Sequence, residues 1–192
     1  DVEMKGHTIS AGVHVGFLAK PSDRFSVGMR FLSGQTAKVD NAKLTTAQVS
    51  TNLKTAVPLP GIAAGTPYDT ILTAQFADGA ALESGQKGST RLPMPAQFVG
   101  GIAYKAAPRL SVFADYRWVQ WSKFDKLVIY KENSTAPTET VEAYRNANAF
   151  HAGVEYELSP RLVVRGGWFA NSAAAPDQTV TPNLPEGKRQ NY

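Results

Sequence analysis

Residues 8–31 decide the fold and read TISAGVHVGFLAKPSDRFSVGMRF. On both sides of the turn at 20–23, apolar side chains recur at every second position, from Ile9 to Ala19 and from Phe25 to Phe31. Successive side chains of a strand point to opposite faces, so this period of two predicts two strands that share an apolar face. A proline that presets the backbone, with serine and aspartate beside it, predicts a tight hairpin turn between them.

The same pattern occurs twice more along the chain. A turn at 107–108 divides the alternation that runs from Phe98 to Trp118, and a turn at 159–160 divides that from Phe150 to Trp168. An all-β fold is therefore expected, with about six strands in three hairpins that have short turns at one end and longer loops at the other. This asymmetry and the apolar face are typical of an antiparallel transmembrane β-barrel. A soluble all-β binding domain also alternates and is the alternative.

The two faces of these strands are expected to differ in role. The outward aromatic side chains are predicted to contact lipid and to form the interfacial girdle; they are Phe17, Phe31, Tyr104, Tyr116, Trp118, Tyr156 and Trp168. The inward side chains mix charged and apolar groups, which a hydrated lumen allows. The candidate ligand-binding residues come from this inward set and are Arg30, Phe113, Arg117, Val119, Val163, Arg165 and Phe169.

Residues 39–92 interrupt the alternation and are rich in Thr, Ala, Gly and Pro. We therefore expect one long extracellular loop here, with a short helix or strand at 68–76. Loops of this length usually carry a function. Its apolar residues are the candidates for capturing a hydrophobic ligand, namely Leu59, Ile62, Tyr68, Ile71, Leu72 and Phe76. An unspecific surface loop is the alternative interpretation.

Composition excludes several other functions. The net charge is only +4, and the basic residues are scattered, which argues against nucleic-acid binding. The chain has no cysteine, and His7, His14 and His151 are too dispersed to predict a metal site. No P-loop, dinucleotide fingerprint or nucleophile elbow occurs, so we expect neither an enzyme nor a cofactor. An outer-membrane hydrolase is the enzymatic alternative.

Three short motifs carry a resemblance to a known family. They are Leu92-Pro93-Met94-Pro95 before a strand, residues 121–127 (WSKFDKL) after the next strand, and Arg165-Gly166-Gly167 in the last. With them, the stretch from Leu92 to Asn191 resembles the FadL/TodX (OMPP1) family of outer-membrane transporters for long-chain fatty acids and aromatic hydrocarbons. The segment 175–189 is similar to a loop of that family, with Leu184 and Glu186 in place of the commoner Ile and Asp.

The resemblance implies a fourteen-stranded barrel in the outer membrane of a Gram-negative bacterium, with an amino-terminal hatch inside. The chain is then expected to be an internal part of one barrel domain that lacks the hatch and the carboxy-terminal strands. The complete protein is expected to be a monomer in contact with outer-membrane lipid or lipopolysaccharide. Its implied function is passive uptake of long-chain fatty acids or other hydrophobic small molecules. A structural or adhesive barrel without transport is the alternative.

The inward arginines acquire a specific role from this resemblance. An arginine among apolar neighbours is able to bind the carboxylate of a fatty acid through two parallel hydrogen bonds while the neighbours cover its chain. The alternative is structural pairing between charges of adjacent strands, which brace the wall of many barrels.

Overall fold

The computed structural model describes residues 2–58, 60–178 and 189–191 of the chain. It contains two compact units. The smaller unit comprises Asp1–Ile9, Lys38–Arg91 and Val128–Thr140, and the larger unit comprises Ser10–Ala37, Leu92–Leu127 and Val141–Tyr192. Within the described ranges, no helix is long and apolar enough to cross a membrane.

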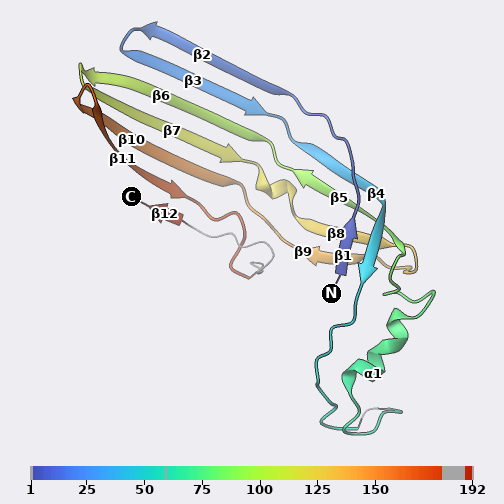
Figure 1. The fold of residues 1–192 in the computed structure, drawn as a ribbon. Coiled ribbons are helices and arrows are strands. Elements are labelled where there is room, and N and C mark those ends of the chain that lie inside the picture. Colours follow the sequence, from blue (N-terminus) through green and yellow to red (C-terminus); the bar gives the residue numbers. More distant parts are fainter. Residues whose placement is uncertain (1, 59, 179–188, 192) are drawn as a thin grey trace. The chain divides into compact units, whose positions relative to one another are not determined.

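The larger unit is built on a seven-stranded antiparallel sheet with the order β12-β11-β10-β7-β6-β3-β2 (Figure 1). Its strands are β2 (His14–Ser22), β3 (Phe25–Leu32), β6 (Gln97–Ala107), β7 (Leu110–Val119), β10 (Ala147–Ser159), β11 (Leu162–Asn171) and β12 (Arg189–Asn191). Six of them are the strands that alternation predicted. The chain returns from a long excursion after β3 to place β6 beside it, so the hairpins are direct neighbours.

Each hairpin of this sheet closes through a two-residue turn, at 23–24, 108–109 and 160–161. Figure 1 shows all three turns at the same end of the sheet. The pairing register is irregular beside every turn, between Ala19 and Ser22, between Lys105 and Ala107, and between Glu157 and Ser159. The predicted tight hairpins are therefore present.

The first strand is shorter than its sequence pattern predicted. Alternation suggested a start near Ile9, whereas β2 begins at His14 and Ile9 is 99% exposed. Before that point side-chain hydrogen bonds add to a single backbone bond, from the Ser33 N–H to the Val13 carbonyl (2.9 Å). The Val13 N–H donates to the Ser33 hydroxyl (2.8 Å), and the Ser10 hydroxyl donates to Gln35 (3.1 Å).

A five-stranded sheet, lying mostly in the smaller unit, has the order β1-β4-β5-β8-β9. Its strands are β1 (Val2–Lys5), β4 (Gln35–Thr46), β5 (Lys87–Met94), β8 (Lys126–Lys131) and β9 (Thr138–Val141). The expectation of one loop over 39–92 is therefore wrong at both ends, which belong to β4 and β5. Between them lie the helix α1 (Tyr68–Leu72) and the 3-10 helix η1 (Thr73–Phe76), which confirm the short element expected there.

The tryptophan-containing motif of residues 121–127 has a packing role. The 3-10 helix η2 (Trp121–Lys123) follows β7 along the chain. Trp121, Phe124 and Tyr144 pack edge to face, with ring centroids 5.2–6.5 Å apart. Phe124 is only 8% exposed and, with Ala174 and Ala175, belongs to the buried cluster of the larger unit. The motif thus anchors the connection after β7.

Candidate functional site

The pairing register sorts the side chains of the seven-stranded sheet onto two faces. Directly paired residues of neighbouring strands lie on the same face, so each register row can be followed from β2 to β11. One face carries all the aromatic residues that were predicted to point outward. We call it the apolar face, and its predicted members are Phe17, Phe31, Tyr104, Tyr116, Trp118, Tyr156 and Trp168.

The opposite face, which we call the polar face, brings together all seven candidate ligand-binding residues of the sheet. They lie on three strands, β3, β7 and β11, and are Arg30, Phe113, Arg117, Val119, Val163, Arg165 and Phe169. The shared face is an observation, whereas a ligand-binding role for these residues stays a prediction. In a membrane barrel the apolar face meets lipid, so the polar face is the one that lines the lumen.

Two pairs of opposite charge or polarity span adjacent strands on the polar face. The Asp115 carboxylate lies 2.6 Å from Nδ1 of His151, and the ring of Phe169 lies 6.0 Å from the His151 ring. The Nε of Arg165 donates to the Glu155 carboxylate at 2.6 Å. Arg165 therefore has the structural pairing that was the alternative to ligand binding.

Arg30 and Arg117 differ from Arg165 in their surroundings. Both pair in register with Val99, from opposite sides, so they belong to one row of the polar face. Among the described residues neither guanidinium group forms an ion pair or a side-chain hydrogen bond. These two arginines are the members of the predicted set that remain available to an anionic ligand.

A groove of about 580 Å³ adjoins Arg30 on this face. That volume lies within the roughly 300–1,000 Å³ typical of small-molecule sites. Gly28 and Gly101 are part of its floor, and a Cβ on Gly101 would come within 3.0 Å of the Asp115 Cβ. Glycine at these positions keeps the groove open. Its lining from the polar face includes Leu18, Gly28, Arg30, Gly101, Phe113 and Asp115.

The candidate capture residues lie outside the sheets, and the structure shows no common groove for them within its described ranges. Tyr68 and Leu72 are exposed on α1, while Ile62, Ile71 and Phe76 are half-buried. Leu59 lies outside the described residues, as do Leu184 and Glu186 of the family-like loop.

Asp69 holds this segment together and was not identified from the sequence. Its carboxylate accepts hydrogen bonds from the Ser50 hydroxyl (2.8 Å) and from the Thr51 backbone N–H (3.2 Å). These donors favour the charged form, so the Ser50 hydroxyl first and the Thr51 N–H second hold the pKa of Asp69 below its usual range.

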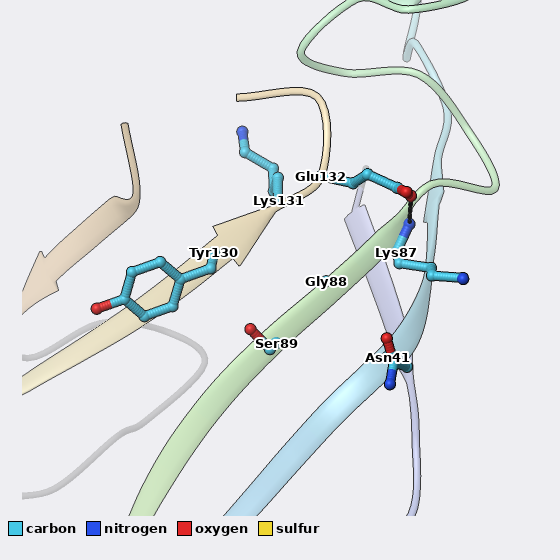
Figure 2. Close-up of a pocket in the computed structure, with 7 residues that line it drawn as sticks. All are labelled: Asn41, Lys87, Gly88, Ser89, Tyr130, Lys131 and Glu132. Carbon is cyan, nitrogen blue, oxygen red and sulfur yellow. Dashed lines mark hydrogen bonds between the residues drawn. The ribbon is translucent and has the colours of Figure 1, made fainter. Parts of the chain in front are cut away.

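A groove of about 310 Å³ on the sheet of the smaller unit was also missed by sequence reasoning (Figure 2). It is lined by Asn41, Lys87, Gly88, Ser89, Tyr130, Lys131 and Glu132, from three segments that are distant in the sequence. Figure 2 shows the Lys87 backbone N–H donating to the Glu132 carboxylate (3.2 Å). Three of its lining residues, Lys87, Lys131 and Glu132, carry a charge.

The two histidines of the larger unit do not meet. His14 on β2 and His151 on β10 are separated by three strands of the sheet. In the part of the chain that the structure describes, no group of three His, Cys, Asp or Glu side chains is arranged to hold a metal ion.

Comparison with known proteins gives one family and several relatives. The profile of the family described as "Outer membrane protein transport protein (OMPP1/FadL/TodX)" matches residues 2–192. A curated relative, the 47 kDa outer membrane protein of Pasteurella multocida (strain Pm70), is 28% identical over 102 residues. That match covers 53% of this chain and 24% of the relative, so the chain spans about a quarter of its length.

Three solved structures share the fold. A Pseudomonas aeruginosa FadL homologue has a TM-score of 0.70 at 22% identity, over 93% of this chain and 38% of that one. The Pseudomonas putida toluene transporter TodX has a TM-score of 0.50 at 16% identity, over 84% and 34%. The CymD monoaromatic hydrocarbon channel has a TM-score of 0.53 at 18% identity, over 91% and 42%. The predicted class, an antiparallel transmembrane β-barrel, is confirmed by this likeness.

Proposed function

This chain belongs to the outer membrane protein transport family (OMPP1/FadL/TodX), and from that premise we propose that it takes part in passive uptake of hydrophobic compounds across the outer membrane. The predicted family and outer-membrane location are confirmed by the profile match and the curated relative. Members of this family are transporters rather than enzymes. The identity of the ligand and the passive nature of the uptake are the proposed parts.

The observation that carries the proposal is the groove on the polar face with Arg30 beside it. A long-chain fatty acid needs an apolar wall for its chain and a cation for its carboxylate. Leu18 and Phe113 supply apolar surface in the groove, and burial of each methylene group gains about 0.8 kcal/mol. Arg30, with Arg117 in the same row, supplies the charge, because a guanidinium group matches a carboxylate with two parallel hydrogen bonds.

The register row of Arg30 and Arg117 offers non-covalent contacts, which fit transport driven by the concentration gradient. Phe113 and Arg30 offer contacts of moderate strength on an open wall, and a ligand that is held moderately is able to leave again. We propose that Tyr68 and Leu72 on α1 make the first contact outside the membrane, because both are exposed and lie one helical turn apart.

A monoaromatic hydrocarbon is the second candidate ligand. Two of the solved structures that share the fold are named as a toluene transporter and a monoaromatic hydrocarbon channel. Such a ligand would use the apolar part of the groove and would have no need of Arg30 or Arg117.

The apolar face supports further proposals about the protein's surroundings. Its aromatic residues are proposed to contact outer-membrane lipid and lipopolysaccharide, with the tyrosines and tryptophans at the interfaces. A single barrel surrounded by lipid in this way is proposed to act as a monomer.

Uptake by living cells tests the proposal. Oleate and toluene uptake would be measured in cells that lack their own transporter and express the full-length protein, with an empty vector as control. Oleate uptake alone supports the fatty-acid ligand, and toluene uptake alone supports the aromatic one. A folded outer-membrane product that imports neither would refute transport and leave a structural or adhesive barrel.

A further inference from the structure

The three short turns of the seven-stranded sheet carry the same residue at the same place. Arg24, Arg109 and Arg161 are each the second residue of a two-residue turn. Backbone hydrogen bonds join neighbouring turns: the Lys105 N–H donates to the Arg24 carbonyl (2.8 Å), and the Glu157 N–H donates to the Arg109 carbonyl (2.9 Å). The three arginines therefore form a row along one end of the sheet, which we call the arginine row.

The arginine row is exposed, and its charge is not neutralised locally. Within the residues that the structure describes, none of its guanidinium groups forms an ion pair or a side-chain hydrogen bond. In the four residues before each turn arginine, Lys20 and Lys105 add positive charge, while Asp23 and Glu157 are acidic. Hairpins repeat every two strands, so neighbouring arginines stand roughly 10 Å apart.

Aromatic side chains place the row at the margin of the membrane. Phe25, Tyr104 and Tyr156 lie on the apolar face within four residues of a turn. Tyrosine is enriched where hydrocarbon meets the headgroups of the bilayer. The arginine row, just beyond these rings, is therefore at the depth of the lipid headgroups.

The orientation of the barrel selects the leaflet. Short turns of outer-membrane barrels face the periplasm, whereas their long loops face outward. The leaflet on the periplasmic side consists of phospholipids. This step rests on membership of the family and on the turn lengths, and it is independent of which ligand passes through the lumen.

We infer that the arginine row is a binding site for the phosphate groups of anionic phospholipids in the periplasmic leaflet. A guanidinium group bonds two phosphate oxygens at once, and three of them in a row present a repeated site along the wall. Each basic residue close to an anionic membrane surface adds attraction that corresponds to a roughly fivefold preference. The row thereby fixes the depth of the barrel on its periplasmic side.

The test measures lipid selectivity of the full-length protein in phosphatidylcholine bilayers. Spin-labelled phosphatidylglycerol and spin-labelled phosphatidylcholine are compared by the fraction that the protein surface immobilises. The native protein is expected to prefer phosphatidylglycerol several-fold, and added salt is expected to reduce this preference. The variant with Arg24→Gln, Arg109→Gln and Arg161→Gln is expected to lose it. Slower migration after heating, the usual sign of a folded barrel, confirms that each variant is assembled.

A matched control separates this site from general charge. Lys38→Gln, Lys43→Gln and Lys54→Gln remove three exposed charges from the smaller unit and are expected to leave the selectivity unchanged. Equal selectivity in the arginine variant and the native protein, or equal loss in the lysine control, would overturn the inference. Stronger retention of spin-labelled lipid A than of phosphatidylglycerol by the native protein would overturn the assignment to phospholipid. Toluene or oleate uptake in the same variants reports separately on transport.

Discussion

Replacing Arg30 and Arg117 with glutamine is expected to weaken the binding of a fatty acid, while replacing Arg165 is not. Arg30 and Arg117 pair in register with Val99 from its two sides, so two strand spacings separate them. Their Cα atoms are then roughly 10 Å apart, and both side chains lie on the polar face. Two extended arginines at this separation reach one carboxylate placed between them.

The size of the effect follows from the bonds that each substitution removes. A hydrogen bond to a charged group contributes about 1.5–3 kcal/mol, so each glutamine is expected to raise the Kd for oleate roughly tenfold to a hundredfold. Arg165 already donates to Glu155 at 2.6 Å, and its side chain is 71% exposed. An exposed pair of this kind contributes about 0–1 kcal/mol, so the Arg165→Gln variant is expected to change neither affinity nor stability by much.

Titration calorimetry of the full-length protein in detergent with oleate and with oleyl alcohol gives the assay. The alcohol has the same chain without the charge, so its affinity is expected to be unchanged in the variants of Arg30 and Arg117. The reasoning is refuted if both ligands lose affinity equally, because that would indicate damage to the groove. It is refuted as well if Arg165→Gln weakens oleate as strongly as the other two substitutions.

Three further predictions concern the groove, the aromatic cluster and the loop. Gly28→Leu is expected to block uptake, because the new side chain would fill the groove. The sheet should accept it, since a Cβ at Gly28 would lie 3.5 Å from the nearest atom, and Gly166→Leu on the apolar face should transport normally. Phe124→Ala should lower the free energy of unfolding by about 3–5 kcal/mol in denaturant titrations, and Tyr130→Ala, which is 53% exposed, by far less. The hydrogen bonds to Asp69 stabilise its charged form, so their contribution is complete above the usual pKa of 3.8 and is lost as the pH falls through the lowered value. Backbone hydrogen exchange at residues 48–53 is expected to become faster when the pH falls below the lowered pKa of Asp69. The Asp69→Asn variant is expected to lack this pH dependence.

Alternation predicted the strands of the larger unit because apolar side chains occupy one face of each of them. The six strands and the three turns follow from that pattern, together with the grouping of side chains on two faces. The strands β4 and β5 were missed for a physical reason. In β4 the buried positions are Ala37, Ala42, Leu44 and Thr46, and Asn41 has a φ of +53°, which breaks the period between them. A strand with small and polar side chains and an irregularity has no clear period of two.

Charge pairs between different hairpins were not predictable from the sequence. Asp115 and His151 are 36 positions apart in the sequence. Their contact depends on the register between β7 and β10, which joins two different hairpins. Arg165 and Glu155 belong to one hairpin, so the turn at 160–161 fixes their register. Local turns are readable in a sequence, whereas the offset between separate hairpins is decided by the packing of the whole sheet.

The pairing register of the seven-stranded sheet decides which side chains lie on the polar face. A shift of one residue moves every side chain of a strand to the other face. A shift of β7 would carry Arg117 and Asp115 into lipid and would bring Trp118 and Tyr116 into the lumen. The irregularities beside all three turns set the offset of each hairpin before the regular ladder begins. The turns thus help to determine which side chains lie on the polar face.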